Sequence, residues 1–103
     1  MAVTLHKTSL FYSDYVEIVS YISEANPDAA DRFCDAVESA LELLASHPQL
    51  AAKAGFQHAP DVRKWVIRQF PNYVIYYRES PGAAVLLRLL HGARNARELI
   101  QNP

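Results

Sequence analysis

The 103-residue sequence contains one cysteine, three glycines and no long apolar run. The single cysteine, Cys34, excludes an internal disulfide, and its neighbours Phe33 and Val37 indicate a small core residue on a helix rather than a reactive thiol. No basic start followed by an apolar stretch marks a signal peptide or a membrane span. We therefore expect a cytoplasmic protein that does not associate with membranes.

Several chemical motifs are also missing. The sequence has no glycine-rich phosphate-binding loop and no serine in a nucleophile elbow. His6, His47 and His58 lie in separate segments without the spacing of metal ligands. We therefore predict no metal site and no cofactor.

What the sequence does contain is typical of a globular protein. Half of its residues are hydrophobic and 11% are aromatic, which is enough apolar surface for a packed core. A chain of this length closes around a single core. Residues 1–103 are therefore expected to form one domain.

Charge is distributed unevenly along the chain. Residues 1–57 have three basic and eight acidic side chains, a net charge of −5, whereas residues 58–103 have seven basic and three acidic ones, a net charge of +4. Six of the seven cations in the second part are arginines, which suit planar contact with carboxylate or phosphate. They are Arg63, Arg68, Arg78, Arg88, Arg94 and Arg97. This asymmetry predicts an anionic partner for the second part.

Hydrophobic periodicity predicts a strand followed by two helices. Residues 3–8 alternate between apolar and polar, and residues 12–24 repeat apolar side chains every three or four positions. Asn26 and Pro27 then favour the start of a second helix over 27–46, which ends before Pro48. Because the link is short, the helices must form an antiparallel hairpin.

The second part of the chain reads as an antiparallel meander. Three β-branched and aromatic runs, 62–69, 73–79 and 84–91, are separated by the turn sequences FPN and SPG. A helical turn is expected around residues 50–53. Asn95 and Glu98 resemble the capping box of a short C-terminal helix. The predicted fold is α+β, with the hairpin packed on a three- to four-stranded antiparallel sheet.

Strand alternation predicts which side chains face the hairpin. The inner face would hold Trp65, Ile67, Tyr73, Ile75, Tyr77, Val85, Leu87 and Leu89. The outer face would hold Lys64, Val66, Arg68, Val74, Tyr76, Arg78, Leu86, Arg88 and Leu90. Cations from three strands would then share one surface with an apolar strip, which would be exposed to solvent unless a partner covers it. A disordered peptide that folds on binding and contains apolar and acidic residues would suit this surface. Tyr76, Leu86 and Leu90 would be its apolar contacts.

The order of strand, hairpin and meander, with YISEANPDAADRF, VRKWVIRQFPNYVIYY and the ending VLLRLLHGARN, resembles the ParE branch of the RelE/ParE toxins. The resemblance covers nearly the whole chain. It implies a bacterial type II toxin that binds and inhibits DNA gyrase and is neutralised by a ParD-like antitoxin. It implies contact with DNA only through that antitoxin, which agrees with the acidic residues beside Tyr12 and Tyr15.

The RelE branch of these toxins cleaves messenger RNA on the ribosome, which needs an acid, a base and cations around one phosphate. RelE-like nucleases place an arginine after the strand tyrosine and a tyrosine or histidine near the C-terminus. This chain has Val74 after Tyr73, and Leu99 and Ile100 near its end. Two expected groups are absent, so no catalytic residue is assigned.

His91 is the strongest candidate for acid–base chemistry because histidine titrates near neutrality and Arg94 is close in sequence. Alternation places it on the inner face, which favours a structural role in hydrogen bonding the chain end. Gly92 suits a sharp corner there. A ribosome-dependent endoribonuclease using His91, Arg68 and Arg88 is the alternative function. A third is a decayed toxin that survives as antitoxin partner and co-repressor.

Overall fold

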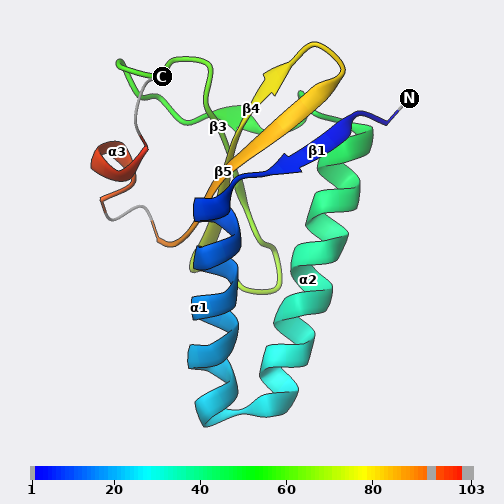
Figure 1. Ribbon diagram of the computed structural model, residues 1–103, viewed down its shortest axis with the longest axis vertical. Coiled ribbons are helices and arrows are strands. Elements are labelled where there is room, and N and C mark those ends of the chain that lie inside the picture. The colour runs from blue at the N-terminus through cyan, green and yellow to red at the C-terminus, as the bar shows by residue number, and fades with distance from the viewer. Residues whose placement is uncertain (1, 93–94, 101–103) are drawn as a thin grey trace.

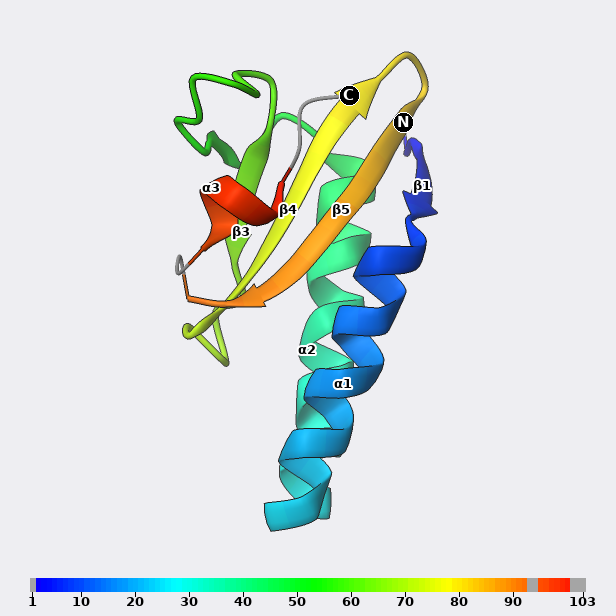
Figure 2. The same ribbon diagram turned by 60° about the vertical axis from the view of Figure 1, so that its left-hand side comes forward.

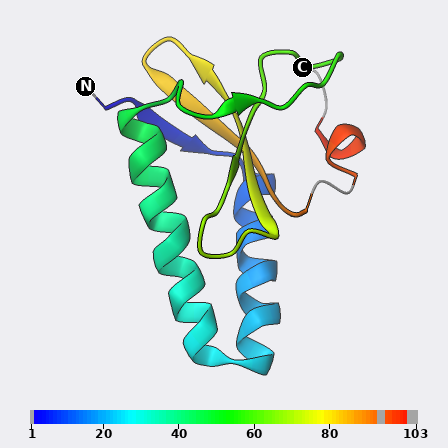
Figure 3. The ribbon, with the colours of Figure 1, turned by 180° about the vertical axis from the view of Figure 1, so that it is seen from behind.

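The computed structural model describes residues 2–92 and 95–100, and it has the predicted α+β architecture (Figure 1). A short first strand leads into two helices, and the remaining strands and a short last helix follow. Figures 1 and 3 show the two helices side by side and extending well beyond the end of the sheet. The helical hairpin is therefore packed on the sheet along only part of its length.

The hairpin consists of α1, Ser9–Ala25, and α2, Pro27–Ser46. Asn26 ends one helix and begins the other, because its side-chain Oδ1 accepts a hydrogen bond from the amide of Ala29 at 3.1 Å. Pro27 occupies the first turn of α2, where its missing amide hydrogen is not needed. The predicted cap, the predicted link and the bounds of the second helix are confirmed.

The sheet has five strands in the order β1-β5-β4-β3-β2. They are β1, Thr4–Lys7; β2, Ala52–Lys53; β3, Arg63–Val66; β4, Tyr73–Ser80; and β5, Ala83–His91. β1 is parallel to β5, and the other neighbours are antiparallel. The helical turn expected at residues 50–53 is wrong, because Ala52 and Lys53 pair with β3 as an edge strand.

Strand β3 is shorter than its sequence pattern predicts. The amides of Phe70 and Tyr73 donate hydrogen bonds to the carbonyls of Ile67 and Phe70, which forms a tight connection to β4. Arg68, predicted as the end of the strand, consequently lies in this turn. The turn places Arg68 beside α2 rather than on the outer face of the sheet.

A β-bulge changes the faces of β5. Tyr76 pairs with Arg88 but Tyr77 pairs with Leu86, so Leu87 is the extra residue. After the bulge the predicted alternation holds, with Leu89 in the inner core and Leu90 outside. Before it the alternation is reversed, and Leu86 lies in the inner core. The predicted faces of Val85, Leu86 and Leu87 are therefore wrong.

The main core lies between the hairpin and the sheet, and Phe33 of α2 is at its centre. The Phe33 ring is fully buried and makes edge contacts with Phe70 and Tyr73 at centroid distances of 5.2 and 5.1 Å. Tyr15 of α1 stacks on its other side at 6.4 Å. Phe33 therefore connects both helices with the turn and the start of β4.

A second core covers the opposite face of the sheet. There the loop 54–62 and α3, Ala96–Leu99, pack on β4 and β5 (Figure 2). The buried members are Ala59, Val62, Val74, Tyr76, Leu90, Ala96 and Ile100. Most of the apolar strip on the outer face, for which the sequence predicted a partner, is thus covered by the chain itself, although Val66 is still 45% exposed.

The corner before α3 is only partly as predicted. Gly92 has a φ of +70°, which glycine adopts without strain, so its expected role in a sharp corner is confirmed. Asn95 precedes the helix with a left-handed backbone and makes no side-chain capping hydrogen bond. The predicted capping box with Glu98 is therefore wrong, because the Asn95 side chain does not bind the helix amides.

Candidate functional site

Three of the predicted partner-binding arginines are already paired with carboxylates of the same chain. Arg63 donates from Nε to Glu79 Oε1 at 2.9 Å and from Nη1 to the carbonyl of Ala51 at 2.6 Å. Its register partner Tyr77 faces the main core, so Arg63 lies on the inner side, at the edge near β2. This arginine fixes the loop after α2 to the sheet.

Arg78 is the second paired arginine, on the same face as Tyr76 (two positions earlier in β4). Its Nε lies 2.9 Å from Asp61 Oδ2, although the angle does not make a hydrogen bond, and Nη2 donates to Oδ1 at a long 3.4 Å. Because the Asp61 side chain is more than half exposed, this pair contributes little to stability. It nevertheless occupies the Arg78 guanidinium.

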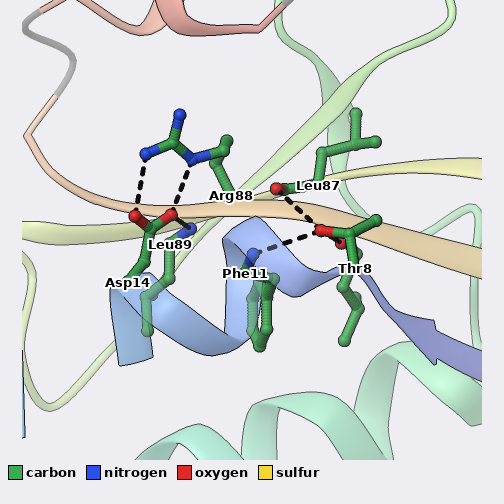
Figure 4. A network of polar contacts seen from close by, with 7 residues as sticks. Thr8, Phe11, Asp14, Leu87, Arg88 and Leu89 are labelled. Carbon is green, nitrogen blue, oxygen red and sulfur yellow. Dashed lines mark hydrogen bonds and ion pairs between the residues drawn. The ribbon is translucent and has the colours of Figure 1, made fainter. Parts of the chain in front are cut away.

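Arg88 makes the strongest ion pair, with Asp14 of α1 (Figure 4). Its Nε and Nη2 donate to Asp14 Oδ2 and Oδ1 at 2.7 and 2.8 Å, and the amide of Leu89 donates to Oδ2 at 3.0 Å. The side chains of the pair are 15% and 14% exposed. The hydrogen bonds to Asp14 raise the pKa of Arg88, while burial opposes the rise.

The contact between Asp14 of α1 and strand β5 follows from the topology of the sheet. β1 ends at Lys7, opposite Leu86, so the rest of β5 has no strand on that side. Thr8 and Asp14 supply the missing hydrogen bonds: Thr8 Oγ1 donates to the carbonyls of Leu86 and Leu87 at 2.9 and 3.2 Å, and Asp14 accepts from Leu89. Figure 4 shows the contacts with Leu87 and Leu89. The start of α1 therefore completes the edge of β5.

The other arginines are in different surroundings. Arg68 and Arg97 are exposed and form no ion pair among the described residues. Arg68 lines a groove beside α2, and Arg97 lines a polar cavity with Gly55, Gln57 and His58. Arg94 lies outside the described residues. The predicted arginines consequently do not form one outward surface.

The three predicted apolar contacts are buried. Tyr76 is 2% exposed and Leu90 is 9% exposed, both beneath the loop 54–62 and α3, while Leu86 is fully buried on the opposite side of the sheet. A partner reaches these side chains only if part of the chain moves away. Their predicted exposure is wrong because local alternation contains no information about a covering loop.

The structural role predicted for His91 belongs to His58 instead. His91 is exposed at the end of β5, and its ring meets that of Tyr73 edge-on at 5.0 Å. The hydrogen bond to the chain end is made by His58, whose Nε2 lies 2.7 Å from the carbonyl oxygen of Ile100. His58 also stacks on Phe56 at 5.6 Å. No sequence pattern distinguished His58, because its partner is 42 residues away.

A groove runs between α2 and the turn connecting β3 with β4. Two adjoining hollows of about 300 and 170 Å³ share Ala36, Ser39 and Gln69. Their remaining lining consists of Arg32, Asp35, Ala40, Leu43, Trp65, Arg68 and Phe70. The groove thus combines an apolar floor with a guanidinium from each side, and sequence reasoning did not find it.

A separate cavity of about 350 Å³ opens beside α1. It is lined by Glu17, Ile18, Tyr21, Tyr73 and His91. Burial raises the pKa of Tyr73, and Tyr21, which lines the same cavity, raises it further. This cavity combines one carboxylate with three aromatic rings.

The described residues give no sign of a metal centre or a membrane span. Within residues 2–92 and 95–100, no three histidine, cysteine, aspartate or glutamate side chains are grouped so that they could hold a metal ion. In the same ranges, no helix has both the length and the apolarity to cross a bilayer.

Comparison with known proteins places this fold in a family. The model of the ParE toxin of the type II toxin-antitoxin system, parDE, matches residues 6–96, from within β1 to the first residue of α3. The chain belongs to the ParE toxin family. The resemblance noted from the sequence is thereby confirmed. The match includes all the arginines predicted to contact a partner except Arg97.

Structural comparison agrees with membership of the ParE family at the level of fold. A solved structure titled "Chromosomal ParDE TA system from P. aeruginosa" contains a chain that is 15% identical to this one. The match has a TM-score of 0.75 and covers 88% of this chain and 97% of that chain. No curated protein matches the sequence.

Proposed function

We propose that this ParE-family chain is a cytoplasmic bacterial toxin that inhibits DNA gyrase by binding it and is neutralised by a ParD-like antitoxin. The observation that carries the proposal is the family match over residues 6–96. In this proposal the chain contacts DNA only through the antitoxin. The acidic face of α1, with Glu17 and Glu24 exposed, supports that division because it repels phosphate.

The positions of the candidate catalytic residues support binding over RNA cleavage. Cleavage needs an acid, a base and cations at a single phosphate. Arg88 is held by Asp14, Arg68 lines the groove beside α2, and His91 lines the cavity beside α1. Arg68 is thus on a different surface from His91, and Arg88, although near the cavity, has its guanidinium bound by Asp14. This arrangement disfavours the endoribonuclease alternative.

Inducing the chain without its antitoxin tests the target. We expect DNA breaks and loss of supercoiling that depend on gyrase, and no cuts in ribosome-bound messages. His91→Ala is expected to leave these effects within about twofold, because His91 has no catalytic role in this proposal. RNA cleavage that disappears in His91→Ala would instead establish a nuclease, and the absence of any growth effect would indicate a decayed toxin.

The groove beside α2 is the surface that best suits the antitoxin. A disordered tail that folds on binding gains from burying apolar side chains and from pairing its carboxylates. Trp65, Phe70 and Leu43 supply the apolar wall, and Arg32 and Arg68 supply cations that form no ion pair among the described residues. On the outer face that the sequence favoured, α3 and the loop 54–62 cover β4 and β5.

Reversing one groove charge tests this assignment. Arg68→Glu should weaken binding of an acidic and apolar tail of the ParD-like antitoxin about tenfold, since an attraction becomes a repulsion. The control is Lys64→Glu, an exposed cation on the outer face of β3 that leaves the groove unchanged. Calorimetric titration with the tail peptide measures both. Equal weakening by the two substitutions would show only a general charge effect and would place the tail elsewhere.

A further inference from the structure

The cavity beside α1 is lined by acidic, aromatic and aliphatic side chains. Among the described residues that line it, Glu17 is the only carboxylate, and no lysine or arginine contributes. Tyr21, Tyr73 and His91 add aromatic rings, and Ile18 adds an aliphatic wall. A carboxylate between aromatic rings is a favourable environment for a cation.

Among the described residues, the charge beside the cavity is negative even though Arg88 is close. Arg88 is neutralised by Asp14, to which it donates two hydrogen bonds. Glu17 also acts on Arg88 electrostatically, but more weakly than Asp14 does. Asp14 and Glu17 are thus two carboxylates near one guanidinium. Because Arg88 is hydrogen-bonded to Asp14, the charge of Glu17 is not neutralised by it. The sequence of α1 contains no lysine or arginine to compensate it.

The surface around the cavity suits a protein segment rather than a free small cation. Glu17 and Tyr21 are four residues apart on α1, and Leu10 is seven residues before Glu17, so all three are on one side of the helix. Leu10 and Tyr21 are 55% and 71% exposed. A partner segment lying along this side would cover both apolar groups and bring a side chain to Glu17.

We propose that the cavity formed by Glu17, Tyr21, Tyr73 and His91 binds an arginine side chain from a partner protein, with apolar residues of the same segment resting on Leu10 and Ile18. A guanidinium donates two parallel hydrogen bonds to a carboxylate and stacks on aromatic rings, which an ammonium does less well. A volume of about 350 Å³ suits a single side chain. This site is separate from the groove beside α2 and does not depend on it.

The experiment uses the purified full chain and the peptide acetyl-Leu-Ala-Arg-Ala-Leu-amide, followed by NMR. The expected result is saturable shifts of the ring signals of Tyr21, Tyr73 and His91. A peptide with citrulline in place of arginine has the same shape without the charge and should bind at least tenfold more weakly. Lysine in that position should bind with intermediate affinity.

Substitutions at Glu17 separate the site from general acidity of the hairpin. Glu17→Gln should reduce affinity for the arginine peptide about tenfold, because the bidentate carboxylate is lost. Glu24→Gln removes an exposed carboxylate on the same helix, two turns away, and should leave affinity unchanged. Unshifted amide signals of the main core will show that both variants are folded.

Three results would overturn the proposal. One is equal affinity for the arginine and citrulline peptides, which would make the contact merely apolar. Another is an equal loss in Glu17→Gln and Glu24→Gln, which would make it a diffuse charge effect. The third is dimerisation of the chain alone, measured by sedimentation and abolished by Glu17→Gln, which would identify a second copy as the occupant.

Discussion

Asp14→Ala is expected to lower the free energy of unfolding by about 3 kcal/mol, a large effect for one residue on a helix surface. The substitution leaves the Arg88 guanidinium without its carboxylate at a position where the side chain is 15% exposed. It also leaves the amide of Leu89 without the acceptor that completes the edge of β5. Urea denaturation followed by far-UV circular dichroism measures the change.

Two further variants separate the charge from the hydrogen bond. Asp14→Asn keeps an acceptor for the Leu89 amide but removes the charge, and should cost about half as much. Glu24→Ala, at an exposed position of the same helix, should stay within about 0.5 kcal/mol of the parent. If Asp14→Ala behaves like Glu24→Ala, the contact between α1 and β5 contributes nothing measurable and our account of that edge is incorrect.

Phe33→Ala is expected to destabilise the protein by about 4 kcal/mol, within the range for removing a buried phenylalanine. The ring is fully buried and contacts Tyr15, Phe70 and Tyr73, which come from three different segments. Truncation leaves a cavity where these segments meet, and their backbones are too constrained to close it. Thermal and urea unfolding should both show the loss.

The matched control for Phe33→Ala is Tyr12→Ala on α1. Tyr12 is 61% exposed, so it loses little buried area on truncation, and we expect a change below about 1 kcal/mol. Phe33→Leu should lie between the two, because it retains part of the apolar volume. A Phe33→Ala protein that unfolds like the parent would mean that the hairpin is not held to the sheet through this residue.

The ion pairs change what the arginine content means for function. Composition alone indicated a basic half with an anionic partner, but Arg63, Arg78 and Arg88 are bound to Glu79, Asp61 and Asp14 of the same chain. Within the described residues, Arg32 and Arg68 beside α2, and Arg97 on α3, are the arginines without such a pair. The surface available to an acidic partner is therefore smaller than composition implied, and it is centred on the groove.

The same pairing explains why sequence reasoning mislocated the candidate site. The partners are 16, 17 and 74 residues apart along the chain, whereas periodicity reports only on neighbours within a turn or a strand. Three of the six predicted arginines are consequently part of the internal structure. The cavity with His91 and the groove with Arg68 each combine residues from the hairpin and the meander, which no local pattern connects.

Local sequence signals predict most of the helices and strands and their order, with the edge strand β2 as the exception. Apolar spacing, the Asn26 cap and Pro27 specify the hairpin, and β-branched runs between turn residues specify the meander, because these signals act over a few residues. Only the tertiary structure shows which faces of the strands are buried and which are covered by other segments. The bulge at Leu87 reverses the faces of β5 before it, and α3 with the loop 54–62 closes the outer face. Both depend on packing between distant segments, where the free energy of burying a whole face outweighs any local preference.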